Sequence, residues 1–186
     1  WVANQDGSFS TNPKGNAGTY YDLMFLDKNL TAGDFSLSFE VNYPVSKIDN
    51  GTNIGFSFFA PTNDPYASVR VSINYWGLLT VDKSGKILTA TPEADSIGYS
   101  DTKFEKVDIT VKGNNIKVYF NGKLTCDSEF KKFANGSTFF FADLKEVDKD
   151  KVITFRNVKF KNASGETVDL EYTFADGTPF EDVEVN

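Results

Sequence analysis

The stretch VDITVKGNNIKVYFNGK, residues 107–123, is the clearest local indication of the fold in the sequence. Hydrophobic and polar residues alternate over 107–112 and again over 116–120, which is the period-two pattern of half-buried β-strands. Gly113-Asn114-Asn115 separates the two runs, and Asn121-Gly122 follows the second run. Asn-Gly pairs accept the positive φ angles of tight hairpin turns. The stretch therefore predicts antiparallel strands joined by short turns.

The same alternation continues on both sides of this hairpin. Residues 34–43 and 69–76 each place large apolar side chains on one face and polar side chains on the other. Further strands are expected near 54–60, 78–82, 86–90, 137–142, 152–160 and 167–174. We expect Phe139–Phe141 to be buried on both faces, and 128–134 is a weak helix candidate. So many short strands predict an all-β fold, a two-sheet antiparallel β-sandwich or jelly roll.

Length and charge narrow the class of protein. At 186 residues the chain suits a single sandwich domain, residues 1–186. Residues 161–186 are more acidic, and we favour a strand that returns to a sheet over the start of a connection to a neighbouring domain. The net charge of −7 disfavours nucleic acid and anionic membranes, which attract basic proteins. No apolar run is long enough for a transmembrane helix, so membrane insertion is not expected.

Three segments in this order resemble the concanavalin A-like lectin/glucanase superfamily, in its laminin-G-like branch. They are residues 33–41, the hairpin at 107–123 and residues 153–160. The resemblance spans roughly residues 7–160 and implies a curved double sheet whose concave face or loop edge often binds sugars. Members include plant-type lectins, bacterial carbohydrate-binding modules and glycoside hydrolases, and the fold alone does not select among them.

The residues argue against catalysis. The chain has no His, which excludes Ser-His-Asp and Cys-His arrangements and histidine-based zinc sites. Cys126 is the single cysteine, and we expect it to be a small buried hydrophobe. The paired acids on one strand that the resemblance implies for glucanases are absent, since Glu40 is alone on its strand face. We therefore expect a domain that is not an enzyme, although it could belong to a larger glycoside hydrolase.

Sugar binding requires flat aromatic surfaces and planar hydrogen-bonding groups. The polar face of the 69–76 strand and the loops beside it offer both. The candidate carbohydrate-binding residues are Trp76, Arg70, Asn74, Tyr99, Tyr66, Asp64 and Glu40. Purely structural roles are the alternatives: Arg70 could pair with Glu40 or Asp82 on a neighbouring strand, and Trp76 could close the end of the core.

No cofactor is required by this interpretation, but the resemblance implies a structural calcium ion held by oxygen ligands. Donors are available at Asn4–Asp6, Asn63-Asp64 and Asp148–Asp150, with solvated turns as the alternative. None of these segments matches an EF-hand loop.

Together these features predict a non-catalytic carbohydrate-binding module of a secreted or cell-surface bacterial protein, with a polysaccharide or oligosaccharide as partner. Because the chain starts at Trp1 rather than Met, we expect it to be processed or excised from something longer. We also expect a monomer within a larger multidomain chain. Two alternatives are an adhesive or structural domain that binds protein, and a glycoside hydrolase of the same fold.

Overall fold

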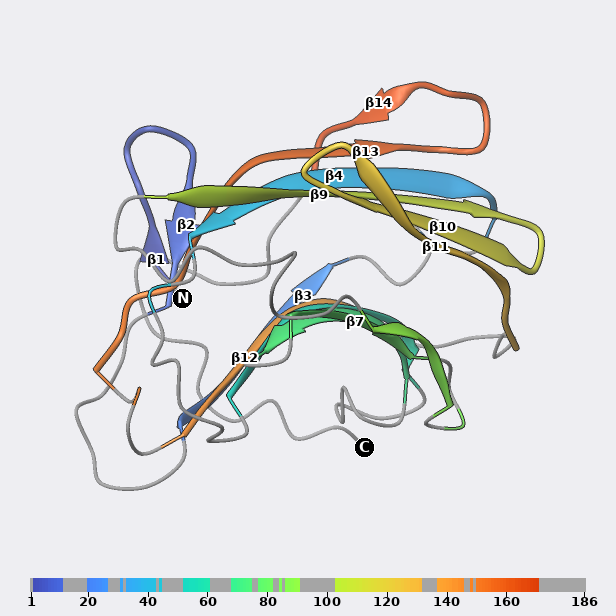
Figure 1. Cartoon of the computed structure of the whole chain (residues 1–186). Coiled ribbons are helices and arrows are strands. Elements are labelled where there is room, and N and C mark those ends of the chain that lie inside the picture. Colours follow the sequence, from blue (N-terminus) through green and yellow to red (C-terminus); the bar gives the residue numbers. More distant parts are fainter. Residues whose placement is uncertain are drawn as a thin grey trace.

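The computed structural model describes residues 2–11, 20–26, 31, 33–42, 44, 52–60, 68–74, 77–81, 84, 86–90, 103–131, 137–145, 148 and 150–170 (Figure 1). Over these residues the chain forms strands and turns and no α-helix. No helix among them is long and apolar enough to cross a bilayer. The expected all-β sandwich is confirmed.

The strands form two antiparallel sheets. The eight-stranded sheet has the order β1 (Val2–Ala3), β2 (Phe9–Ser10), β13 (Thr154–Lys161), β4 (Phe35–Asn42), β9 (Phe104–Lys112), β10 (Asn115–Phe120) and β11 (Lys123–Glu129), and β14 (Thr167–Val168) pairs with β13. The six-stranded sheet has the order β3 (Tyr20–Leu26), β12 (Ser137–Leu144), β5 (Asn53–Ala60), β6 (Val69–Asn74), β7 (Gly77–Val81) and β8 (Ile87–Ala90). Strands distant in sequence thus become neighbours.

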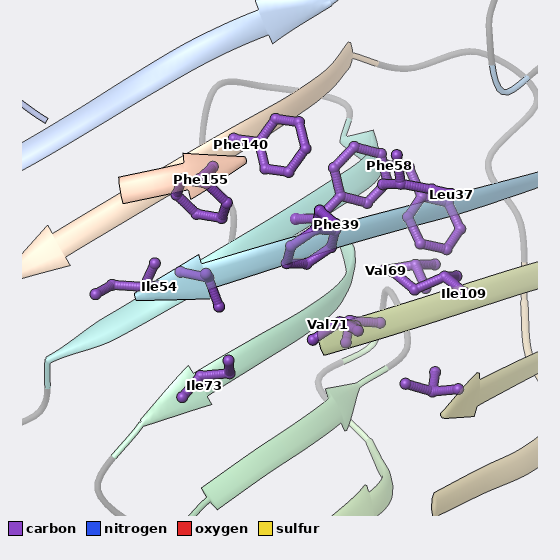
Figure 2. Close-up of a cluster of buried hydrophobic side chains, with 14 of the residues drawn as sticks. Leu37, Phe39, Ile54, Phe58, Val69, Val71, Ile73, Ile109, Phe140 and Phe155 are labelled. Carbon is purple, nitrogen blue, oxygen red and sulfur yellow. The ribbon is translucent and has the colours of Figure 1, made fainter. Parts of the chain in front are cut away.

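The core lies between the two sheets. Side chains from β4, β9 and β13 meet side chains from β5, β6 and β12 there (Figure 2). Phe140 is central, with its ring centroid 5.0 Å from that of Phe155 and 5.1 Å from that of Phe56. Cys126 belongs to the same cluster, which confirms the expectation of a small buried hydrophobe.

The hairpin from which the fold was inferred has the expected turn chemistry. Asn121 and Gly122 have φ angles of 49° and 82° and connect Phe120 directly to Lys123. At the other end Lys112 pairs with Asn115, so the turn is the two residues Gly113-Asn114, and Asn115 already belongs to β10.

The helix candidate at 128–134 is wrong over its described part, since residues 123–129 form β11. These residues follow a two-residue turn and pair with β10, with Cys126 facing the core opposite Val118. Pairing across a tight turn therefore prevails over a weak local helix preference.

The two sheets differ in shape. Figure 1 shows the six-stranded sheet bent into an arch, with its hollow side turned away from the eight-stranded sheet. That hollow side is called the concave face below. Because core side chains occupy the other side of this sheet, the alternate residues of β5, β6 and β12 project onto the concave face.

Candidate functional site

The concave face is built from cross-strand rows of residues. In β6, Val69, Val71 and Ile73 point into the core, so Arg70 and Ser72 lie on the concave face. One row runs Phe139, Ser57 and Arg70 across β12, β5 and β6. The next row runs Phe141, Gly55 and Ser72 across the same strands.

A third row lies near the end of these strands. It contains Asp143, Asn53 and Asn74, which are paired in register across β12, β5 and β6. Lys145, just after β12, donates from Nζ to Oδ1 and Oδ2 of Asp143 at 2.8 and 3.0 Å. The carboxylate is buried, whereas the lysine side chain is 32% exposed. The row therefore brings a carboxylate, an ammonium and an amide to one end of the face.

The middle of the face is packed rather than open. Phe139 and Phe141 are fully buried, which confirms that the Phe run is covered on both faces. Ser57 and Ser72 are also buried, and in the part of the chain that the structure describes their hydroxyls have no hydrogen-bond partner. A buried hydroxyl without a partner typically costs about 1–3 kcal/mol. Of the residues in these three rows whose burial the structure describes, Arg70 and Asn53 are partly exposed.

Arg70 and Glu40 are not brought together. Arg70 is half-buried on the concave face, as the alternation predicted for the polar side of its strand. Glu40 lies in β4, in the other sheet, so the pairing of Arg70 with Glu40 considered from the sequence does not occur. The period-two pattern shows which residues share a face of a strand but not which sheet the strand joins. Asn74 lies at the end of β6, beside Asn53 in register.

Glu40 has structural partners of its own on the outer surface of the eight-stranded sheet. Arg156 donates from Nη2 to Oε1 of Glu40 at 3.2 Å, and the Asn157 amide donates to Oε2. The Arg156 guanidinium also lies 3.6 Å from the centroid of the Phe104 ring. The hydrogen bond from Asn157, followed by that from Arg156, holds the pKa of Glu40 below its usual value of 4.5. These contacts make Glu40 part of a surface ion-pair network.

The other sequence-predicted site residues, Trp76, Tyr99, Tyr66 and Asp64, lie outside the described residues, as does Asp82. Sequence reasoning missed Asn53, Ser57, Asp143 and Lys145. The sequence offered one signal for Asp143: by alternation it lies on the same face of its strand as Phe139 and Phe141. Their nearness to Arg70 follows only from the strand order.

The segments considered for calcium have other partners. Asp6 Oδ1 accepts hydrogen bonds from the backbone and hydroxyl of Ser8 at 3.0 and 2.6 Å, and these bonds lower the pKa of Asp6. Asp148 is buried and accepts a hydrogen bond from Thr52 at 3.0 Å, whereas Asp150 is exposed. The described residues contain no group of three or more His, Cys, Asp or Glu side chains that could hold a metal ion. Asn63-Asp64 lies outside the described part, so the structural calcium ion stays a prediction.

Comparison with known proteins gives the family. The chain matches the model of the 3-keto-alpha-glucoside-1,2-lyase-like domain over residues 1–161. The chain belongs to this family. No curated protein matches the chain.

Solved structures agree on the fold of the domain. The carbohydrate-binding module CBM66 from Bacillus subtilis superposes with a TM-score of 0.51 at 11% identity, over 83% of this chain and 94% of that one. The carbohydrate recognition domain of Emp47p superposes with a TM-score of 0.53 at 14% identity, over 87% of this chain and 85% of that one. These likenesses show the two-sheet β-sandwich fold that the sequence predicted. The fold is one that carbohydrate-binding domains share.

Proposed function

We propose that this domain recognises a carbohydrate at the concave face of its six-stranded sheet without cleaving it. The ligand would be a glucose-containing oligosaccharide or polysaccharide, and the domain would act within a longer secreted or cell-surface protein. The observation that carries the proposal is the gathering of Arg70, Asn53 and the Asp143–Lys145 pair on that face, in a member of a sugar-directed family. Guanidinium, amide and carboxylate groups are planar and match pairs of sugar hydroxyls.

The arrangement of acids supports binding over hydrolysis. Glycoside hydrolysis by the usual route needs two carboxyl groups about 5–10 Å apart on either side of the scissile bond. Over the described strands of the concave face, Asp143 is the carboxylate present, and Lys145 holds both of its oxygens. A carboxylate held in this way is suited to fixing a hydroxyl in position.

A lyase activity is the second candidate, and the family match is the observation that favours it. In a 1,2-elimination from a 3-keto-α-glucoside, a base removes the proton on C2, which the neighbouring carbonyl makes acidic. The C1–O bond to the aglycone then breaks, a C1=C2 double bond forms, and the departing oxygen takes up a proton. Among the described residues of the concave face Asp143 would act as that base, which would first require the Lys145 ammonium to move away.

The binding proposal is tested by substitution of Arg70. We expect Arg70→Ala to weaken binding of a glucose-containing oligosaccharide by about tenfold or more, because charge-assisted hydrogen bonds are among the strongest polar contacts. The measurement is isothermal titration calorimetry on the whole chain. Lys123→Ala, an exposed lysine on β11 of the other sheet, is the matched control and should bind like the wild type. Equal affinity of Arg70→Ala and the wild type would refute the role of this face.

A further inference from the structure

A second hollow lies on the opposite side of the molecule, on the outer surface of the eight-stranded sheet. Its volume is about 410 Å³, within the range of small-molecule sites. Its floor is a cross-strand row in which Ser36 on β4 pairs with Lys161 on β13 and with Thr110 on β9. Phe35, Phe160 and Val111 beside this row are buried, so the row itself projects outward.

The wall of this hollow is the turn between β13 and β14. Figure 1 shows the β13–β14 hairpin standing away from the sheet on its outer side. Asn162 Oδ1 accepts hydrogen bonds from the backbone N–H groups of Ser164 and Glu166, both at 3.0 Å. The Gly165 N–H donates to the Asn162 carbonyl at 2.9 Å, and Gly165 has a φ of 79°. The wall is therefore fixed by its own turn before any ligand arrives.

The charges around the hollow favour an anion. Lys112 and Lys161 both line it, and within the described part of the chain neither ammonium has an ion-pair partner. Two other lysines on the same surface have an acidic partner, Lys106 with Asp108 and Lys117 with Asp127, each at 3.8 Å. The one carboxylate of the lining, Asp34, accepts a hydrogen bond from the Gly113 N–H at 2.8 Å. Two ammonium groups thus face one carboxylate, in a protein whose net charge is −7.

We propose that this hollow, here called the hairpin pocket (Asp34, Ser36, Thr110, Lys112, Lys161 and the turn 162–165), binds a sugar unit that carries a carboxylate. The carboxylate lies between Lys112 and Lys161, and the ring hydroxyls bond to Ser36, Thr110 and Asp34. The pocket is on the other sheet from the concave face, so this proposal holds or fails independently of the proposed function.

The test is a titration of the whole, isotope-labelled chain with methyl glucuronide, methyl glucoside and acetate, followed by amide NMR shifts. We expect methyl glucuronide to shift the amides of 34–36, 110–112 and 161–165. At these amides methyl glucoside and acetate should bind at least about tenfold more weakly, since each lacks one half of the recognised chemistry. Lys112→Gln/Lys161→Gln should reduce glucuronide affinity by about tenfold or more.

Control variants distinguish binding in the hairpin pocket from binding elsewhere on the protein. Lys117→Gln changes a lysine of the same sheet outside the pocket and should bind methyl glucuronide like the wild type. Thr110→Val should weaken glucuronide binding without weakening acetate binding, because it removes a hydroxyl and no charge. Acetate binding as tight as glucuronide binding, or full affinity in the double lysine variant, would overturn the proposal.

Discussion

Glu40 lies on the outer surface of the eight-stranded sheet, where its carboxylate accepts hydrogen bonds from Arg156 and Asn157. Its alternation with Phe39 and Val41 predicted an outward side chain, and the side chain is 24% exposed. Its partners, Arg156 and Asn157, are more than a hundred residues away in sequence. Asn157 has a φ of 51° and lies where the register between β13 and β4 shifts, which brings its amide to the carboxylate. No pattern in the sequence predicts this register shift.

The Glu40 network gives a pH-dependent prediction. Because the pKa of Glu40 is lowered in the folded state, its stabilisation is fully present above the unfolded value of 4.5. It is lost as the pH falls through the lower, folded pKa. We expect Glu40→Gln to reduce the free energy of unfolding by about 0.5–1 kcal/mol at pH 7. Urea denaturation at pH 7 and pH 3 should show this difference shrinking at the lower pH.

The control for this experiment is Glu129→Gln at the exposed end of β11. Glu129 has no ion pair among the described residues, so the substitution should leave stability at pH 7 unchanged. An equal loss for Glu40→Gln at both pH values would contradict the assignment of the effect to its charge.

At the scale of elements, the 107–123 hairpin was predictable because its information is local. Alternation sets the two strands, and Gly113 and Asn121-Gly122 supply the positive φ angles that its turns use. The helix expected at 128–134 is wrong over its described part because pairing with β10 outweighs the weak local preference for a helix. The expected strand at 167–174 is present as β14 over 167–168, and residues beyond 170 lie outside the described part.

Asn121 makes two side-chain hydrogen bonds at one turn of this hairpin. Its Oδ1 accepts a hydrogen bond from the Lys106 N–H at 2.8 Å, and its amide donates to the buried carboxylate of Glu105. We expect Asn121→Ala to lower the free energy of unfolding by about 1–3 kcal/mol, since it removes both bonds and disfavours the left-handed backbone. Asn121→Gly keeps the backbone freedom and should recover part of this loss.

Thermal and urea denaturation would measure these differences, with Asn114→Ala as the matched control. Asn114 belongs to the other turn, its φ is not positive, and its side chain has no bond among the described residues. If Asn114→Ala lowers the free energy of unfolding as much as Asn121→Ala does, the effect does not come from the two hydrogen bonds and the backbone conformation of Asn121.

At the scale of the whole molecule, the site depends on strand order rather than on any single segment. The concave face combines residues 53–57, 70–72 and 139–145, which become neighbours because β12, β5 and β6 are adjacent. The sequence identified Arg70 through its place in an apolar strand, but it could not indicate that Asp143 shares the face or that Glu40 does not. Alternation carries no information on sheet membership, so the face could be assembled only from the structure.

We propose that this member of the 3-keto-alpha-glucoside-1,2-lyase-like family holds a sugar at its concave face without breaking it. The most direct test is one NMR sample containing the whole chain and a 3-keto-α-glucoside, observed for both bound-state shifts and released aglycone. We predict shifts at the amides of 53–57, 70–72 and 143–145, and no aglycone above the level in a protein-free sample. Steady release of aglycone by the wild type, abolished by Asp143→Asn, would contradict the claim and establish the lyase instead.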